Sequence, residues 1–277
     1  GIVDLFGGRK DLQNGIIRAV GDAKKRFDED ALRMLRAVRF AAQLGFKIDD
    51  DTFEAIKEKA KLLSKVSKER IFVELNKSLC GDFAQNIKMV YTSGLYRYIG
   101  KEFAKLDKSI YDFYPRKFHN KKHMYWAAFL ENIENVEAVN KILFELKSDN
   151  ATRNNAYLLV KELKNPLPSS DEDIRWSLHR IGADLFCDYI EILKSDKKNV
   201  DILDKIDTIE NRYILILKEN HAYEISMLDI TGKDLMDIGI SKGPKIGEVL
   251  EFLLKKVIEN PLNNEKSSLL RLAKEFI

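Results

Sequence analysis

The sequence contains few of the residues that cross-link small folds or bind zinc. Only two of its 277 residues are cysteines, Cys80 and Cys187, and they lie far apart in the chain. A disulfide framework and a zinc site built on a Cys-x-x-Cys pair are therefore not expected, and a reducing compartment, the cytoplasm, fits best. Apolar runs are also short: no segment approaches the roughly 20 residues needed to cross a bilayer, and no signal peptide is predicted.

The chain also lacks a strong excess of charge of one sign. Its 47 Lys and Arg residues nearly balance 44 Asp and Glu residues, which leaves a formal charge of +3. This value is too small to indicate a nucleic-acid partner by itself, so any basic surface has to be local. With 45% hydrophobic and 33% charged residues, the composition is typical of a helical protein with many surface charges.

One pair of histidines has the spacing of a zinc-binding helix. His119 and His123 in "HNKKH" stand four residues apart, but Asn120 replaces the glutamate of the zinc motif and no third ligand is near. No metal site is expected here. The basic residues of this stretch, with aromatic residues around them, suit either an RNA phosphate path or a solvated face over packed aromatics, and the second interpretation is favoured.

A short segment near the start is the one good strand candidate. "GIIRAVG", residues 15–21, is rich in β-branched residues and follows "FGGRKDLQNG", whose Gly and Asn residues suit turns. We therefore expect a hairpin within residues 1–21. Since an isolated hairpin is marginally stable, it is expected to complete a sheet whose other strands lie outside the chain. Gly1 in place of Met likewise favours a fragment or trimmed product over a native start that has lost its Met.

The rest of the sequence predicts helices. The first is expected to begin after Asp28 as N-cap, with Phe27 and Leu32 forming a hydrophobic staple, and to end at Gly45. Ser67 is expected to cap another. The polar, proline-containing segment 165–173 is the clearest linker or helix-start signal. Further helices are expected over 50–66, 68–80, 101–165, 174–220 and after a Gly-containing connector at 228–247. The predicted fold class is mostly α, an elongated multi-helix array with a short β remnant at the N-terminus.

The first predicted helix has an unusual charge pattern. "RFDEDALRMLRAVRF", residues 26–40, carries an acidic residue and three arginines at intervals of three: Asp30, Arg33, Arg36 and Arg39. The aliphatic residues fall on another side of the helix and can form the core: Leu32, Leu35, Val38 and Ala42. For an arbitrary helix, the simplest interpretation is an ion pair between Asp30 and Arg33 with solvated arginines beyond it.

The same residue types can also read the edge of a base. A guanidinium presents paired donors and a carboxylate presents paired acceptors. An Asp that accepts from an exocyclic amino group, beside an Arg that donates to a ring acceptor, fits cytosine and adenine. This pair rejects uracil and guanine, which have carbonyls at the matching positions. The later arginines could then meet a triphosphate, although spacing alone does not establish this.

Residues 2–75 closely resemble the bacterial-type (class II) tRNA nucleotidyltransferases, the CCA-adding enzymes, and their poly(A) polymerase relatives. The resemblance rests on a turn with Asp4, Gly7, Gly8 and Asp11, the signature Glu29-Asp30-x-x-Arg33, the repeat Arg33, Arg36 and Arg39-Phe40, and the helix with Glu69, Arg70 and Glu74. Residues 228–264 resemble the tail of the family. Between about 100 and 220 the likeness is weak.

The resemblance implies a template-independent polymerase that adds C, C and A to the 3′ end of tRNA from CTP and ATP. It implies that Asp30 and Arg33 select the base and that Arg36 and Arg39 line the nucleotide pocket. The residues implied to support this pocket are Asp4, Gly7, Gly8, Asp11, Glu29, Glu69, Arg70 and Glu74. The implied domains are a remnant of the catalytic head (1–26), a neck (27–100), a helical body (101–220) and a tRNA-binding tail (221–277).

The chain departs from the family in one respect. Members hold two Mg²⁺ ions on a carboxylate pair near their N-terminus, after a Gly-rich segment, and neither feature is present in this sequence. The Mg²⁺ ligands are therefore expected outside this chain, which alone should bind but not catalyse. A poly(A) polymerase, a CC- or A-adding relative and a non-catalytic tRNA-binding piece remain as alternatives.

A second candidate binding element lies in the tail segment "GISKGPKIG". Gly243-Pro244 predicts a helix with Pro in its first position, which leaves free amides near Lys242 and Lys245. A phosphate of tRNA could bind to Lys242, Gly243 and Lys245, and the family resemblance points the same way. A plain turn between two helices is an equal alternative.

Overall fold

The computed structural model describes residues 3–119 and 121–276, and the chain divides into two compact units, Gly1–Lys164 and Asn165–Ile277. The boundary falls at the start of the proline-containing segment 165–173, as the sequence predicted for a linker. The finer division into head, neck, body and tail stays a prediction. None of the helices in the described part of the chain is long and apolar enough to span a membrane.

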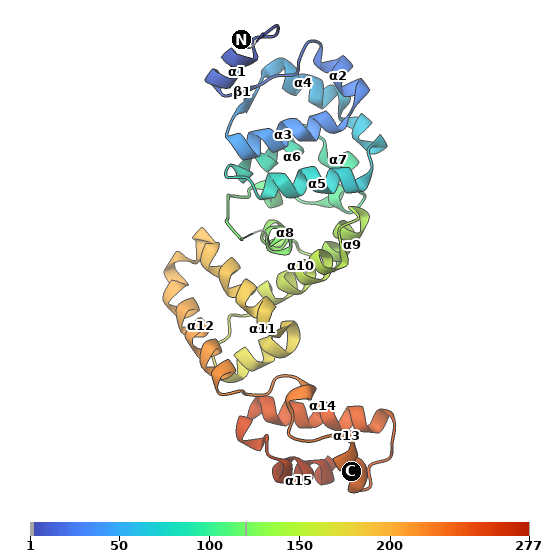
Figure 1. Cartoon of the computed structure of the whole chain (residues 1–277), viewed down its shortest axis with the longest axis vertical. Coiled ribbons are helices and arrows are strands. Elements are labelled where there is room, and N and C mark those ends of the chain that lie inside the picture. Colours follow the sequence, from blue (N-terminus) through green and yellow to red (C-terminus); the bar gives the residue numbers. More distant parts are fainter. Residues whose placement is uncertain (1–2, 120, 277) are drawn as a thin grey trace. The chain divides into compact units, whose positions relative to one another are not determined.

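The first unit is helical, with one small sheet (Figure 1). Its α-helices are α1 (Gly8–Asn14), α2 (Ala23–Glu29), α3 (Leu32–Leu44), α4 (Asp50–Lys59), α5 (Lys68–Leu79), α6 (Lys88–Thr92), α7 (Tyr96–Ile99), α8 (Lys122–Leu130), α9 (Glu137–Glu145) and α10 (Asn150–Leu163). Four 3₁₀ helices connect them: η1 (Ala60–Lys65), η2 (Ala84–Ile87), η3 (Phe103–Lys105) and η4 (Lys108–Tyr111). The mostly α fold class is confirmed.

The strand prediction was correct in place and wrong in pairing. Strand β1 (Ile16–Ile17) lies inside the predicted segment, but it pairs in parallel with β2 (Lys47–Ile48) rather than forming a hairpin. The expected turn before it is the helix α1. Asp4 accepts hydrogen bonds from the amides of Gly8 and Arg9, at 2.8 and 2.9 Å, and these bonds satisfy donors that a helix start leaves unpaired. The β remnant therefore finds its partner within the chain, beyond α3.

The first predicted helix begins three residues later than expected, at Leu32, and the segment before it forms a separate helix, α2. Asp22, not Asp28, caps α2 by accepting from the amides of Lys24 and Lys25. The chain then leaves helical geometry at Asp30, where φ is −148° and ψ is 101°, and α3 begins at Leu32. Phe27 lies inside α2, so the predicted staple and N-cap were both wrong. The break separates Asp30 from the arginines that follow it, which changes how the site is built.

The apolar face of α3 agrees with the sequence pattern. Leu32, Leu35, Val38 and Ala42 are all buried, and Gly45 ends the helix with a left-handed φ of 71°. Figure 1 shows α3 and α5 side by side across the middle of the unit. Helix α5 begins after Ser67 as predicted, although the Ser67 side chain makes no capping hydrogen bond. The buried face of α5 contains Ile71, Phe72, Leu75 and Leu79, and α5 packs against α3.

The second unit contains α11 (Asp171–Ser195), α12 (Leu203–Lys218), α13 (Gly232–Asp237), α14 (Pro244–Glu259) and α15 (Lys266–Phe276), with 3₁₀ helices at Lys197–Ile202, Ile225–Met227 and Pro261–Asn263. Ser170 and Asp173 form a reciprocal capping box at the start of α11. Within α11, Gly182 has φ 77° and ψ 164°, a conformation open to glycine that kinks the helix. The helix start predicted at Pro244 is confirmed.

Gly81 provides a test of how closely the ends of α3 and α5 pack. A Cβ atom at Gly81 would lie 2.3 Å from the carbonyl oxygen of Ala42, which accepts a 2.8 Å hydrogen bond from the amide of Phe83. We expect Gly81→Ala to lower the free energy of unfolding of the first unit by about 1–3 kcal/mol, because backbone atoms have to move apart. Urea unfolding followed by circular dichroism measures this change.

Gly247→Ala is the matched control. Gly247 lies within α14, and an added Cβ would meet nothing within 4 Å. This variant should gain up to about 1 kcal/mol from helix propensity. If Gly81→Ala were as stable as the parent chain, the close contact between α3 and the segment after α5 would be wrong.

Candidate nucleotide-binding site

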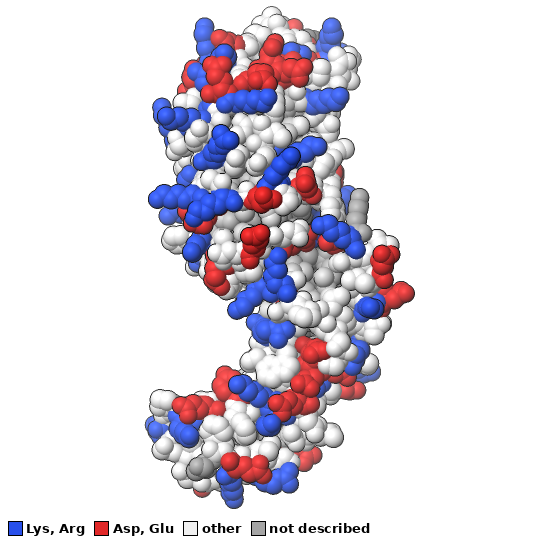
Figure 2. All heavy atoms as spheres, turned by 180° about the vertical axis from the view of Figure 1, so that it is seen from behind, with Lys and Arg blue, Asp and Glu red and all other residues white. Residues whose placement is uncertain are grey.

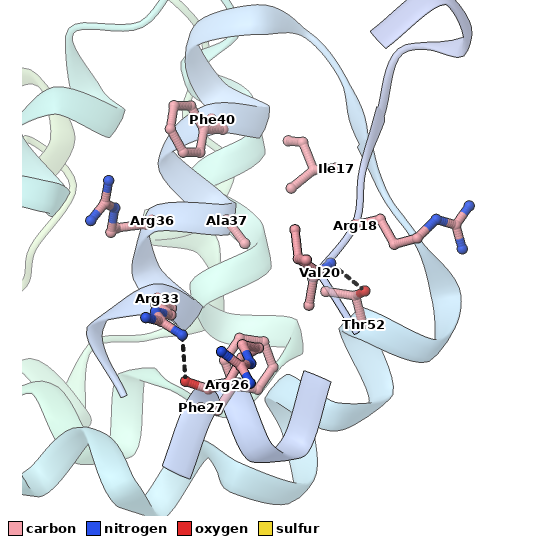
Figure 3. Close-up of a pocket in the computed structure, with 11 residues that line it drawn as sticks. Ile17, Arg18, Val20, Arg26, Phe27, Arg33, Arg36, Ala37, Phe40 and Thr52 are labelled. Atoms are coloured by element: carbon pink, nitrogen blue, oxygen red, sulfur yellow. Dashed lines mark hydrogen bonds between the residues drawn. The ribbon is translucent and has the colours of Figure 1, made fainter. Parts of the chain in front are cut away.

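A pocket of about 440 Å³ lies where α2, α3 and the segment after β1 meet. Figure 3 shows the side chains that line it. Its apolar lining comes from Ile17, Val20, Phe27, Ala37 and Phe40, and its charged lining from Arg18, Arg26, Arg33 and Arg36. The apolar side chains can therefore pack against the flat face of a ligand, and the four arginines can bind an anionic group of it.

Asp30 is held in place by the helix break and by α5. One oxygen, Oδ1, accepts from the amide of Leu32 at 3.1 Å, and the other, Oδ2, accepts from Nη2 of Arg70 at 3.0 Å. Asp30 is not paired with Arg33, and the pitch of one helix does not align the two residues as the sequence pattern suggested. The carboxylate is nevertheless fixed, with 28% of its side chain exposed, although Asp30 is not among the residues that line the pocket.

Arg33 is restrained from the side of α2. Its Nη1 donates to Glu29 Oε2 at 2.9 Å and to the carbonyl oxygen of Arg26 at 3.3 Å. Glu29 also pairs with the guanidinium of Arg26 at 3.0 Å. Figure 3 shows the Arg33 guanidinium over the end of α2, at the lower side of the pocket. Glu29 thus holds the two arginines of this rim close together.

The two later arginines differ in environment. Arg36 is exposed and lines the pocket, and the described part of the chain places no carboxylate in ion-pair distance of it. Arg39 does not line the pocket: its Nε lies 2.8 Å from Glu74 Oε2, and both side chains are nearly buried, at 12% and 10% exposure. This ion pair ties α3 to α5.

The remaining predicted support residues lie in two places, in or just before α1 and in the first turn of α5. Asp4 belongs to the start of α1, where the amides of Arg9 and Gly8 hold the pKa of its carboxyl below the ordinary value. Asp11 accepts from Arg18 Nε at 3.0 Å, and Gly8 and Asp11 line a second, adjoining apolar pocket. Gly7 is the residue before α1, with a left-handed φ of 73°. Glu69 is exposed in the first turn of α5 and lines neither pocket.

Sequence reasoning missed Arg18 and Arg26 as parts of the site. Arg18 also pairs with Asp49, and these contacts with acidic groups, foremost the hydrogen bond that Arg18 donates to Asp11, raise its pKa. Figure 3 shows its guanidinium extending away from α3. Its position depends on the pairing of β1 with β2, which no local signal revealed. Arg26 could have been found, because it stands three residues before Glu29 on one helix.

In the tail segment, Gly243 precedes α14 with φ 129° and Pro244 takes the first helical position. Lys242 is exposed. Lys245 lies 3.7 Å from Glu248 and 4.8 Å from the centre of the Phe276 ring. Both lysines are thus at the start of a 16-residue helix, the place where backbone amides favour an anion.

The segment around "HNKKH" is partly used in packing; Asn120 itself lies outside the described residues. Arg116 is 4% exposed and pairs with Glu131 at 2.6 Å, while Phe118 is fully buried. Among the residues that the structure describes, no group of three His, Cys, Asp or Glu side chains could hold a metal ion. The described residues therefore do not provide a site for the Mg²⁺ ions that the resemblance implies.

Two sequence families match this chain. Residues 117–273 match the family described as "tRNA nucleotidyltransferase domain 2 putative", which is more than half of the chain. Residues 45–106 match "Probable RNA and SrmB- binding site of polymerase A". The second match covers α4 to α7, and the first covers most of residues 100–220, where the sequence resemblance was weak.

Individual relatives agree. The CCA-adding enzyme of Lactococcus lactis subsp. lactis (strain IL1403) is 33% identical over all of this chain and 67% of its own length. That of Ligilactobacillus salivarius (strain UCC118) is 34% identical, again over all of this chain and 67% of its own. This chain thus spans about two thirds of the length of these relatives.

Solved structures show the same fold. The crystal structure of the Bacillus stearothermophilus CCA-adding enzyme in complex with CTP is 26% identical, with a TM-score of 0.80 over 99% of this chain and 68% of that one. The Thermotoga maritima CCA-adding enzyme complexed with tRNA, 20% identical with a TM-score of 0.59, covers 99% of this chain and 68% of that one and supports the fold alone. On these grounds the chain belongs to the bacterial-type (class II) CCA-adding enzymes, the tRNA nucleotidyltransferases.

Proposed function

We propose that this chain carries the base-selecting and tRNA-binding parts of an enzyme that adds CCA to the 3′ end of tRNA from CTP and ATP. The observation that carries the proposal is the pocket beside α3, lined by Arg33 and Arg36, in a chain whose relatives are CCA-adding enzymes. One solved relative with the same fold over this chain is a complex with CTP. A poly(A) polymerase shares the base-reading residues, so product analysis would separate the two activities.

In this proposal, Asp30 and Arg33 recognise the base from two different elements. Asp30 is in the turn between α2 and α3, held by Arg70, and it would accept from the exocyclic amino group of cytosine or adenine. Arg33, held by Glu29, would donate to the ring acceptor beside that amino group. Because separate partners fix the two side chains, the pair needs little reorganisation to bind a base.

Arg36 and Arg39 have different roles in this proposal. Arg36 is the best candidate for a phosphate contact, since it lines the pocket without an acidic partner in the described chain. Arg39 was expected in the pocket lining, and its ion pair with Glu74 favours a supporting part instead. The residues of this chain bind and orient the nucleotide.

The first prediction of this proposal concerns Asp30. Asp30→Ala should lower the preference for CTP over UTP by roughly tenfold, because one hydrogen bond to a charged group contributes about 1.5 kcal/mol. The preference is measured by equilibrium binding of the two nucleotides to the chain and by their relative incorporation into tRNA by the complete enzyme.

Asp28→Ala is the control for Asp30→Ala. Asp28 is a nearby exposed carboxylate that pairs with Lys59 at 2.9 Å, whereas Asp30 pairs with Arg70, so its removal changes the local charge equally without touching the contact that holds Asp30. Selectivity should then remain as in the parent protein. Unchanged selectivity in Asp30→Ala would count against the assigned role of Asp30.

The second prediction concerns the start of α14. Changing Lys242 and Lys245 together to Gln should weaken tRNA binding and reduce the slope of log affinity against log salt by up to about 0.9 for each lost phosphate contact. Fluorescence anisotropy with labelled tRNA at several salt concentrations measures both quantities.

The matched control removes two exposed lysines from the same unit, Lys255 and Lys274, away from the helix start. Its salt slope should stay close to that of the parent chain. If both double variants behaved alike, the start of α14 would not be a specific phosphate site.

A further inference from the structure

A second pocket in the first unit joins basic and aromatic residues. It has a volume of about 340 Å³ and lies between the α4–η1 segment and the α6–α7 segment. Its charged and aromatic lining consists of Lys57, Glu58, Lys61, Tyr91, Arg97 and Tyr98. We call it the tyrosine pocket. It shares no lining residue with the pocket beside α3, so it is a separate site.

Some charged residues of the tyrosine pocket have ion-pair partners and others do not, within the described part of the chain. Glu58, its one acidic residue, pairs with Lys24, and Lys57 pairs with Glu54 at 2.6 Å. In the described part of the chain, neither Lys61 nor Arg97 has a carboxylate within ion-pair distance, and both are exposed. The pocket therefore offers two positive charges to an anion.

The aromatic side chains of the pocket are fixed in advance. Tyr91 packs between Tyr96 and the buried Tyr111, with ring centres 4.7 and 5.3 Å apart. Arg97 donates from Nε to the Tyr96 hydroxyl at 3.2 Å, and its guanidinium lies 5.5 Å from that ring centre. One basic group of the pocket is thus held in place by the aromatic stack.

Tyr98 differs from these rings. It is half-buried, and among the described residues no other aromatic ring packs against it. Because Tyr98 also lines the pocket, we expect a planar base to stack on its ring there. A cationic rim beside an aromatic platform is the arrangement with which proteins bind single-stranded nucleic acid, where the backbone meets the cations and the bases meet the rings.

We propose that the tyrosine pocket binds one nucleotide of single-stranded RNA, with its phosphate at Lys61 and Arg97 and its base on Tyr98. The inference rests on the proposed function in one respect, namely that RNA is the macromolecular substrate. Figure 2 shows why local pockets matter here: Lys and Arg side chains on the visible face of the first unit are interleaved with acidic ones, so no broad basic surface covers it. On this face, we therefore expect RNA to bind at local sites instead of along a continuous basic surface.

The test measures binding of a fluorescein-labelled single-stranded RNA of about 12 nucleotides to the complete chain by anisotropy at several salt concentrations. Changing Lys61 and Arg97 together to Gln should lower affinity roughly tenfold at low salt and reduce the salt slope by about 0.7, the contribution of one single-strand phosphate contact. The control variant, Lys101→Gln with Lys108→Gln, removes two exposed charges of the same unit outside the pocket and should keep the slope.

A second measurement needs no substitution. An RNA that contains 5-iodouridine, photo-crosslinked to the parent chain, should attach to the peptide that contains Tyr98, which mass spectrometry identifies. Crosslinks found only elsewhere, or equal salt slopes for the two double variants, would overturn the proposal; an acidic protein partner would then be the better match for Lys61 and Arg97.

CTP binding separates this proposal from the proposed function. The Lys61/Arg97 variant should retain it, whereas a chain that binds RNA here but never binds CTP would contradict the proposed function alone.

Discussion

The ion pair between Asp30 and Arg70 is the contact on which the candidate site depends. It joins the turn between α2 and α3 to α5, and α5 is itself packed firmly against α3. The amide of Leu32 holds the other oxygen of the same carboxylate. The side chain proposed to read the base is thus fixed by tertiary structure. A neighbouring position on a helix would leave it far more freedom.

The supports of the site are pairwise contacts made by residues of α2 and α5. Glu29 fixes Arg33, while Glu74 and Arg39 tie α3 to α5 below the pocket. The exposed ion pairs contribute little stability by themselves, about 0–1 kcal/mol each. Their importance here is positional, because a rigid pair of donor and acceptor groups discriminates between bases only when its geometry is held.

The sequence predicts the local features of the fold and the site, but it does not predict the contacts between distant residues. The apolar side of α3, its end at Gly45, the linker at 165 and Pro244 at a helix start all follow from local patterns that the structure keeps. The helix break at Asp30 was missed because residues 26–40 fit one continuous helix in charge and apolar spacing. The packing of Arg70 against Asp30 and of Arg39 against Glu74 joins residues 35 to 40 positions apart, and no local pattern encodes such contacts. Parallel pairing of β1 with β2 was missed for the same reason. The assigned roles of these residues stay proposals.

The most direct test of the base-reading arrangement is a crystal structure of this chain with CTP bound. The account predicts that a carboxylate oxygen of Asp30 accepts from the cytosine amino group while Arg33 donates to the adjacent ring acceptor, with Arg70 and Glu29 still in contact with these two residues. A cytosine bound with neither side chain within hydrogen-bond distance of its edge would contradict the account.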